Sequence, residues 1–134
     1  MAEFTLHPRL AADTIFVANW ALSRLQLMND SRYPWLVLVP RRPNLLEFFD
    51  LSRADRELLI EELTRAAQCL KEISGSTKIN VGALGNQVPQ LHVHVVGRHP
   101  GDPAWPGPVW GHSPAVSYDA AARDAFIAQF LSAC

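Results

Sequence analysis

The segment between Ser52 and Gly75 constrains the fold most, because it predicts one long helix in a chain whose other apolar runs are short. Ser52 is a preferred N-cap residue, since its hydroxyl can accept a hydrogen bond from an amide of the first turn. Gly75 is well placed to end the helix, because glycine is common at C-terminal caps. The apolar residues that recur at helical spacing and form one stripe are Leu59, Leu63, Ala66, Ala67, Leu70 and Ile73.

Short apolar segments on both sides of this helix are typical of β-strands. Residues 35–39 form a continuous apolar run between Pro34 and Pro40, and so short a run flanked by prolines favours a buried strand over a helix. Because consecutive strands are joined by short links, we expect antiparallel pairing and an α+β fold. Strands are predicted at residues 14–19, 24–28, 35–39, 78–82 and 91–96.

A single domain is expected over residues 1–134, since domains of roughly 100–150 residues are the most common. Its core is expected at roughly residues 14–98, followed at 99–114 by a loop rich in proline and tryptophan, which proline keeps irregular. A C-terminal helix is expected at roughly residues 117–132. The first ten residues are expected to form an arm or a turn of helix.

The composition argues against several classes of protein. A formal net charge of −1 argues against a nucleic-acid coat protein and a protein bound to a membrane surface, because both usually carry a basic excess. No apolar run in the sequence approaches the roughly 20 residues of a membrane span, and the N-terminus lacks the pattern of a signal peptide. The two cysteines, Cys69 and Cys134, are interpreted as a core thiol and a tail thiol without a disulfide, which predicts a reducing cytoplasm.

The residues best suited to catalysis or ligand binding lie in the segment 85–96. Successive side chains of a strand point to opposite faces, so Gln90, His92 and His94 are expected to share one face. Neighbours on that face lie about 6–7 Å apart. Three polar side chains in a row are poorly suited to a core, and we expect them to face either solvent or a cleft.

Three interpretations of this polar face are open. The simplest is an exposed edge strand with two incidental histidines. The second is a zinc or copper site, although no cysteine is near and the segment holds no carboxylate to complete the ligand set. The third is a nucleophilic histidine, because neutral imidazole is abundant at pH 7 and attacks phosphorus well. A second imidazole on the same face could then steady phosphate oxygens or pass a proton to the leaving group.

The run Gln90-Leu91-His92-Val93-His94-Val95-Val96 resembles the signature of the histidine triad (HIT) superfamily, in which three histidines alternate with apolar residues. The preceding Gly85-Asn86-Gln87-Val88 is similar to the family's lead-in of a glycine and polar residues. Residues 27–30 and 36–40 resemble its apolar-His-Asp turn and its strand ending in proline. The resemblance covers roughly residues 14–98. It implies a HIT-like antiparallel sheet of about five strands with one long helix and a C-terminal helix, in a two-fold dimer.

The resemblance also implies a role for each matching residue. His92 takes the position of the histidine that attacks the α-phosphate and forms a nucleotidyl-histidine intermediate. His94 takes that of the histidine that contacts phosphate oxygens and the leaving group. Asp30 takes the ribose-binding position, beside Asn29 where the family often has histidine, and an Asx-turn role for Asp30 stays equally open. The positions near the phosphate are taken by Asn80, Gly85 and Gln87, and ordinary loop hydrogen bonding is the alternative for Asn80 and Gln87.

One position departs from the family pattern. Gln90 stands where the first histidine of the triad is expected, at a position that supports the site rather than attacking phosphorus. Glutamine keeps a donor and an acceptor but cannot hold a positive charge. The covalent chemistry could survive this change, while the rate, the pH profile and the substrate preference could differ.

Several other charged and aromatic residues are interpreted as structural. Arg41, Arg42 and Arg98 are expected to be solvated surface charges rather than guides for a polyphosphate tail. Trp105 and Trp110, in the loop after the triad segment, are expected to pack within the protein rather than to stack on a base.

The leading hypothesis is a HIT-type nucleotide hydrolase or transferase that acts on a dinucleoside polyphosphate or a nucleoside phosphoramidate. It is expected to work as a homodimer, without a cofactor or metal and without a nucleic-acid or membrane partner. The rival hypotheses are a nucleotide-binding module with little turnover, marked by Gln90, and a protein that binds metal through His92 and His94.

Overall fold

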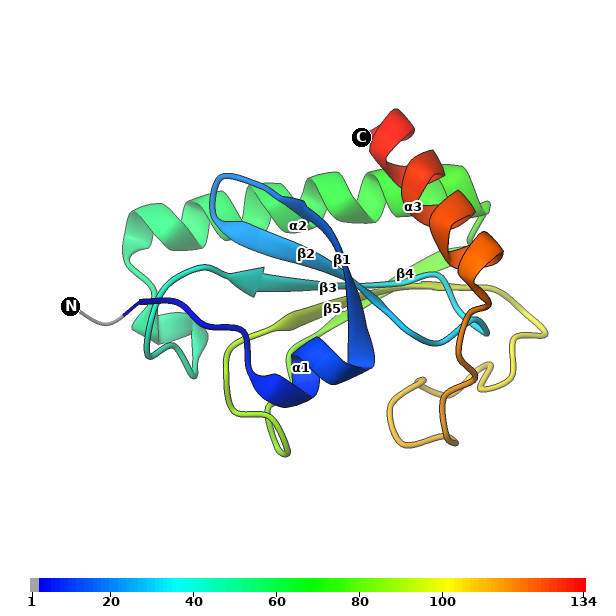
Figure 1. The fold of residues 1–134 in the computed structure, drawn as a ribbon, viewed down its shortest axis with the longest axis horizontal. Helices are drawn as coiled ribbons and strands as arrows, with labels where there is room; N and C mark the ends of the chain where they lie inside the picture. The colour runs from blue at the N-terminus through cyan, green and yellow to red at the C-terminus, as the bar shows by residue number, and fades with distance from the viewer. Residues whose placement is uncertain (1–2) are drawn as a thin grey trace.

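The computed structural model describes residues 3–134 and contains one antiparallel sheet of five strands, in the order β1-β2-β3-β5-β4 (Figure 1). The strands are β1 (Thr14–Asn19), β2 (Ser23–Met28), β3 (Trp35–Pro40), β4 (Lys78–Gly82) and β5 (Val93–Arg98). The helices are α1 (Pro8–Asp13), the 3₁₀ turn η1 (Phe48–Asp50), α2 (Arg53–Ser74) and α3 (Ala120–Ala133). This architecture confirms the predicted α+β class. No helix within the described residues is both long and apolar enough to cross a membrane.

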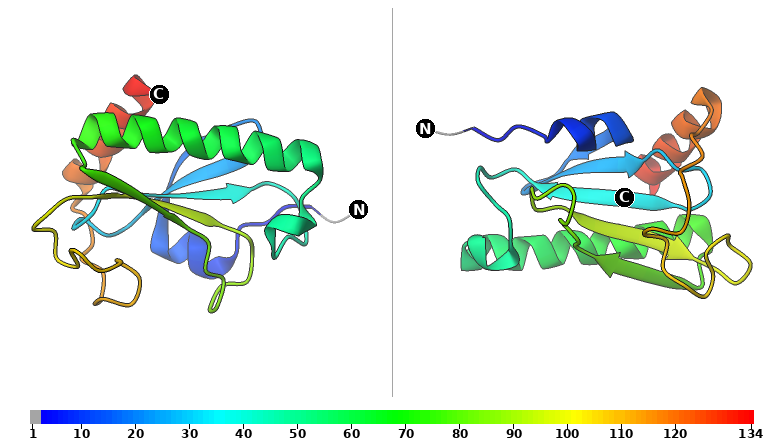
Figure 2. Two further views of the ribbon diagram at one scale, coloured as in Figure 1. Left: turned by 180° about the vertical axis from the view of Figure 1, so that it is seen from behind. Right: turned by 90° about the horizontal axis from the view of Figure 1, so that it is seen from below.

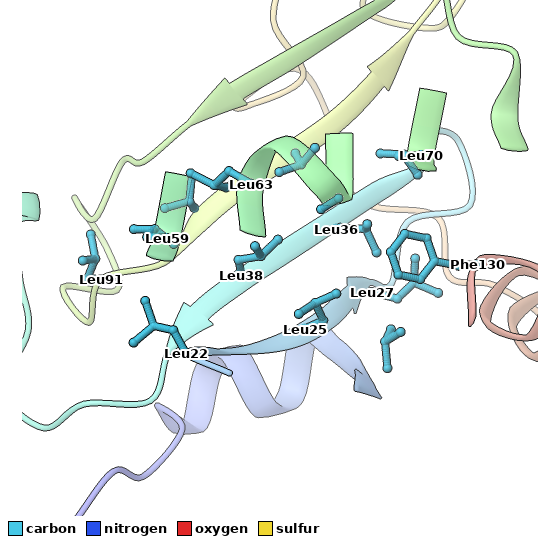
Figure 3. Packing of buried hydrophobic residues seen from close by; sticks show 14 of the residues in the cluster. Leu22, Leu25, Leu27, Leu36, Leu38, Leu59, Leu63, Leu70, Leu91 and Phe130 are labelled. Atoms are coloured by element: carbon cyan, nitrogen blue, oxygen red, sulfur yellow. The ribbon is translucent and has the colours of Figure 1, made fainter. Parts of the chain in front are cut away.

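Helix α2 lies across one face of the sheet (Figures 1 and 2). It begins and ends as predicted, because the Ser52 hydroxyl accepts a hydrogen bond from the amide of Asp55 at 3.1 Å and Gly75 adopts a left-handed φ of 66°. Its apolar stripe packs on alternate residues of the inner strands (Figure 3). Buried members of this first apolar cluster include Leu25, Leu27, Leu36, Leu38, Leu59, Leu63 and Leu70.

The opposite face of the sheet carries α1 and the loop that follows β5 (Figure 1). A second, smaller apolar cluster joins Leu10 of α1 to Val37 of β3 and Val109 of the loop. The segment 99–114 contains no helix or strand, as its prolines predict. Val37 pairs with His94 in the β3–β5 register, so the side chain of His94 points to this face of the sheet.

Helix α3 packs beside α2, and its Phe130 is buried in the first apolar cluster. A disulfide joins Cys69 of α2 to Cys134, with the two Cα atoms 6.0 Å apart. The prediction of two separate thiols is therefore wrong. The packing of α3 against α2 brings together two cysteines separated by 65 positions, and no local pattern in the sequence reports such a contact. The pairing also removes one argument for a reducing compartment.

The triad segment is less regular than predicted. Strand β5 begins at Val93 rather than at residue 91, because its pairing with both neighbouring strands stops at this point. The amide of Leu91 donates instead to the carbonyl of Leu45 at 2.9 Å. His92 therefore lies outside the sheet ladder, and the alternation of a strand does not extend back to Gln90.

Candidate active site

A cleft of about 340 Å³ lies beside the triad segment. Its walls come from segments far apart in the sequence, namely α1, the turn after β2, residues 84–88, the start of β5 and residues 109–115. His92 and His94 both line it, although only 6% and 5% of their surfaces are exposed. Because β5 is an inner strand, His94 does not lie on an exposed sheet edge, and His92, just before that strand, is buried as well.

The tautomer of His92 follows from its hydrogen bond. Its Nδ1 lies 2.7 Å from the backbone carbonyl oxygen of Gln90, and a carbonyl can only accept. The hydrogen therefore sits on Nδ1, which donates to that oxygen. The lone pair of Nε2 is left free in the neutral ring, so His92 presents an unprotonated nitrogen as the candidate nucleophile.

The tautomer of His94 is the opposite. The indole Nε1 of Trp35, which can only donate, lies 3.0 Å from Nδ1 of His94. Nδ1 is therefore the acceptor, and the ring hydrogen sits on Nε2. Burial, aided by the neighbouring His92, lowers the pKa of His94 to about 3, so this imidazole is neutral at pH 7.

The two rings thus offer complementary groups within one cleft. Their centroids lie 4.9 Å apart in an edge-to-face arrangement. The free lone pair of His92 can form a bond to phosphorus, while the N–H of His94 can donate to an oxygen on the same phosphate. Such a pair suits displacement at a phosphate, because the neutral forms of the two rings supply a lone pair and an N–H donor side by side.

Asp30 also lines the cleft, but its carboxylate is already engaged. Its two oxygens accept from the guanidinium of Arg32 at 3.0 and 2.9 Å, and the amide of Arg32 donates at 3.2 Å, as in an Asx turn. Burial works to raise the pKa of Asp30, but these bonds and a weaker one from the amide of Val116 hold that pKa below its usual value. Asp30 is therefore ionised and paired at neutral pH.

Asn29 and Asn80 are absent from the cleft lining and are hydrogen-bonded elsewhere. The side-chain oxygen of Asn29 accepts from the amide of Tyr118 at 3.0 Å and holds the segment before α3 against the turn. The side-chain oxygen of Asn80 accepts from Arg98 at 2.9 Å. Both asparagines therefore support neighbouring segments, and neither lines the cleft.

The loop between β4 and β5 supplies a different wall. Gly85 has a φ of 79°, a conformation that favours glycine because it has no Cβ. This turn brings Gly85, Asn86 and Gln87 to the cleft lining together. The glycine and polar lead-in therefore lies beside the two histidines, as its place before the triad predicts.

Arg98 corrects the expectation of a solvated surface charge. It is 2% exposed, and its guanidinium donates to the carboxylate of Asp102 at 2.7 and 2.9 Å. These bonds hold the pKa of Asp102 below its usual value. The partner lies in the irregular loop, where no periodic pattern in the sequence indicates a side-chain contact.

The other two arginines also have partners outside the cleft. Arg42 pairs with Asp55 at 2.8 Å, near the N-terminus of α2. Arg41 donates to the backbone carbonyls of Trp20 and Ala21. None of the three arginines considered as guides for a polyphosphate lines the cleft.

Trp110 is partly buried against the second apolar cluster, as expected, whereas Trp105 is 37% exposed, so the packing expected of it is not found. The ring centroid of Trp110 lies 5.6 Å from that of His94, and a Cβ at Gly82 would come within 3.0 Å of the indole. Trp110 also lines the cleft, so its indole packs beside His94 at the site itself. Trp105 lies farther out, with its ring 5.8 Å from the guanidinium carbon of Arg98.

Several cleft residues were missed by the sequence reasoning. Arg9 and Asp13 reach the cleft from α1, Arg32 from the turn after β2, and Ser113 from the loop before α3. Only Arg32 carried a local signal, since it follows Asp30 at Asx-turn spacing. Within residues 3–134, no group of three histidine, cysteine, aspartate or glutamate side chains is arranged to hold a metal ion.

Comparison with known proteins identifies the family. The model of the HIT domain matches residues 9–101. The chain belongs to the HIT domain family. Members of this superfamily are in general nucleotide hydrolases or transferases. No curated protein matches the chain.

Solved structures of histidine triad proteins are closely similar to this HIT-domain chain. The protein from Bradyrhizobium japonicum is 44% identical with a TM-score of 0.96, and the match covers 98% of each chain. The protein from Sinorhizobium meliloti is 45% identical with a TM-score of 0.96, covering 98% of this chain and 97% of that one. The protein from Marinobacter aquaeolei is 42% identical with a TM-score of 0.96, covering 98% and 96%.

Proposed function

We propose that this HIT-domain protein cleaves nucleotide derivatives at the α-phosphate through a covalent intermediate on His92. The observation that carries the proposal is the opposite tautomers of His92 and His94 in one cleft. The cleft thus holds a ring nitrogen with a free lone pair beside an N–H donor, and burial lowers the pKa of His94 so that this donor is neutral at pH 7. The candidate substrates are nucleoside phosphoramidates and dinucleoside polyphosphates.

In the first step, Nε2 of His92 attacks phosphorus and the bond from phosphorus to the leaving group breaks. The N–H of His94 donates to a phosphate oxygen and stabilises the charge that develops there. The leaving group takes a proton from water. The phosphorylated ring of His92 is then cationic, and its Nδ1–H keeps its bond to the Gln90 carbonyl, which stabilises that charge.

In the second step, water attacks phosphorus and the bond from phosphorus to Nε2 breaks. The water releases a proton to solvent, the nucleoside monophosphate departs, and His92 returns to its neutral state. Splitting one displacement into two in this way is the general advantage of a covalent route.

The nucleoside is proposed to lie toward Asp30 and the phosphate toward Gly85 and Gln87. Asp30 is held by Arg32, and each oxygen of a carboxylate can accept more than one hydrogen bond, so a ribose hydroxyl can still be received. The amide of Gln87 offers a neutral donor for a phosphate oxygen. Neutral donors at His94 and Gln87 let the cleft bind the reacting phosphate although the chain carries no basic excess.

A homodimer is proposed as the working assembly, as the resemblance implies. Strand β4 lies at one end of the sheet, and its outer side carries no partner strand among the described residues. Exposed apolar side chains cluster around it and on the adjoining turn of α2, including Ile60, Val81 and Leu84. Sedimentation equilibrium of the wild type and of Val81→Glu tests this point, and a wild-type monomer would contradict it.

The main test compares the wild type with His92→Ala on an adenosine phosphoramidate and on a diadenosine polyphosphate. We expect turnover by the wild type on at least one substrate and a loss of about 10³-fold or more in the variant, because the nucleophile is gone. His112→Ala, at an exposed histidine, is the matched control and keeps full activity. Intact mass measured during a single turnover should show one added nucleotidyl group in the wild type and none in His92→Ala.

The same experiment addresses the alternative of a binding module. Equal and negligible turnover in the wild type and in His92→Ala, with nucleotide binding retained in both, would contradict the enzymatic proposal and favour that alternative.

A further inference from the structure

The side chain of Gln90 is bound to the N-terminal arm (residues 3–7) rather than to the catalytic histidines. Its amide oxygen accepts from the backbone N–H of His7 at 2.9 Å, and its amide nitrogen donates to the backbone carbonyl of Thr5 at 2.8 Å. These bonds join positions separated by 83 and 85 residues in the sequence. The side chain that departs from the triad pattern thus has both of its ends engaged by the arm.

A primary amide is well suited to this contact. It carries a donor and an acceptor side by side in one plane, and so it pairs with an extended backbone much as a neighbouring peptide group does. A neutral imidazole has its donor and its acceptor on two ring nitrogens that point in diverging directions. Histidine at this position could therefore not make both bonds in the same geometry.

The arm leads directly into one wall of the cleft. The side chain of His7 caps α1 by accepting from the amide of Arg9 at 3.1 Å, and the carbonyl of His7 accepts from the amide of Ala11. Arg9, Leu10 and Asp13 of this helix line the cleft. Gln90 therefore binds the backbone N–H of His7, and His7 is also the N-cap residue of α1.

Apolar contacts anchor the same wall from the other side. Leu10 is buried in the second apolar cluster, and Phe4 and Leu6 of the arm pack against it. These contacts hold the wall near the sheet, but they are not directional. The two hydrogen bonds of Gln90 are directional, and they set the register of the arm along the segment that enters β5.

We propose that Gln90 is a positioning residue that fastens the N-terminal arm, so that α1 forms a substrate-binding wall of the cleft. Arg9 is the residue that this wall presents. Its side chain is 58% exposed, and its Nε lies 3.6 Å from the carboxylate of Asp13, so an anionic group of the substrate can compete for it. The inference rests on the proposed function, since the wall is assigned to the nucleotide site.

The backbone carbonyl of Gln90 is hydrogen-bonded to His92, the proposed nucleophile. The carbonyl of Gln90 sets the tautomer of His92, and every substitution at position 90 keeps a backbone carbonyl there. Loss of the side chain should therefore weaken substrate binding far more than it slows the chemical step.

The test measures KM and kcat for Gln90→Ala, with Gln68→Ala on the exposed surface of α2 as the matched control. We expect KM to rise about five- to tenfold in Gln90→Ala and kcat to fall by less than about twofold, because two hydrogen bonds to the wall are lost while His92 is unchanged. Gln68→Ala should leave both constants unchanged. A fall in kcat with KM unchanged would overturn the inference.

Gln90→His distinguishes a fastening role from a role in the triad. This variant restores the residue that is typical of the family at the first triad position, and it removes the paired amide. We expect KM to rise as in Gln90→Ala without a gain in kcat. A gain in kcat with KM unchanged would show that position 90 acts on the chemistry and would contradict the proposal.

A double-mutant cycle with Arg9→Ala checks that the effect passes through α1. If Gln90 acts by placing Arg9, the rise in KM of the double variant is smaller than the product of the two single rises. A rise equal to that product would overturn the link to Arg9.

Hydrogen exchange of the His7 amide tests the fastening without any substrate. Its protection should fall at least about tenfold in Gln90→Ala and stay unchanged in Gln68→Ala. Equal protection in Gln90→Ala and the wild type would overturn the inference even if His92 proves catalytic. Lost protection in a protein without nucleotide turnover would leave the fastening intact and contradict only the proposed function.

Discussion

Strands β3 and β5 are buried on both faces of the sheet, but the two faces are built from different side chains. On the face covered by α2, the strands contribute leucines and valines, such as Leu38 of β3 and Val95 of β5. On the other face, the same strands contribute Trp35, Val37 and His94, among charged and polar groups that are also buried. The alternation of side chains along each strand separates the two sets.

The difference shows where this fold places stability and where it places chemistry. Burial of apolar area stabilises the α2 face without directional contacts. A buried polar group on the cleft face is stabilised by a specific partner, because desolvation without a hydrogen bond is unfavourable. His94 has Trp35, which sets its tautomer, and Asp30 has Arg32, which keeps the carboxyl group ionised.

The largest effect is expected on the cleft side, at the ion pair of Arg98 and Asp102. Asp102→Ala leaves the guanidinium buried without its carboxylate and should lower the free energy of unfolding by about 4 kcal/mol. Urea unfolding measures this change. The double variant Arg98→Met with Asp102→Leu removes both charges and should be more stable than Asp102→Ala. A loss below about 1 kcal/mol in Asp102→Ala would show that the pair is not isolated from water.

On the α2 face, Leu38→Ala should lower the free energy of unfolding by about 3 kcal/mol, because it opens a cavity in the first apolar cluster. The kinetic constants should stay near those of the wild type, since the side chain points away from the cleft. Leu46→Ala, at an exposed leucine, is the control and should change the free energy of unfolding by less than about 0.5 kcal/mol. A large change in KM for Leu38→Ala would contradict the separation of the two faces.

The disulfide lies on the side of α2 and α3. Its loss in Cys69→Ser with Cys134→Ser should lower the free energy of unfolding by about 2–3 kcal/mol, because the unfolded chain gains conformational freedom. Thermal or urea unfolding with and without a reductant measures the same effect in the wild type. Nucleotide turnover should be unchanged, and a marked loss of turnover on reduction would show that the two sides are coupled.

A pH-dependent loss of stability is expected from the cleft face. His94 has a folded-state pKa of about 3, below its unfolded value of about 6.5. The unfolded chain therefore binds more protons below that value, and stability falls as the pH falls. Between pH 7 and pH 5 the loss from this group is about 2 kcal/mol.

Comparison of the wild type with His94→Gln by urea unfolding at both pH values isolates this contribution. The variant should lose about 2 kcal/mol less than the wild type between pH 7 and pH 5. His112→Gln, at an exposed histidine, should keep the full dependence. Equal pH dependence in the wild type and in His94→Gln would show that His94 titrates normally.

Local patterns in the sequence predicted most of the secondary structure. The caps at Ser52 and Gly75 gave the bounds of α2, and the short apolar runs located all five strands to within two residues. The strand prediction was least accurate before Val93. The hydrogen-bond ladder of β5 stops where β3 and β4 stop pairing with it, and the residues of β5 alone do not show where that is.

The candidate site was predicted less completely than the fold. His92, His94, Gly85 and Gln87 lie within one short stretch, and the resemblance of that stretch to the HIT signature brought them together. The ion pair on Asp30 had only the weak signal of an Asx turn. No signal in the sequence indicated the wall formed by α1, because the arm that precedes this helix contacts Gln90 across more than 80 positions.

The sequence alone determined the elements, the alternation of the strands and the two imidazoles at the centre of the proposed site, since each depends on neighbours a few residues away. The tertiary structure decided the tautomers of those imidazoles, the disulfide of Cys69 and Cys134, and the partner of Gln90. Those features depend on contacts between distant segments. Such contacts form only when burial of the two faces has packed α1, α3 and the loop after β5 against the sheet.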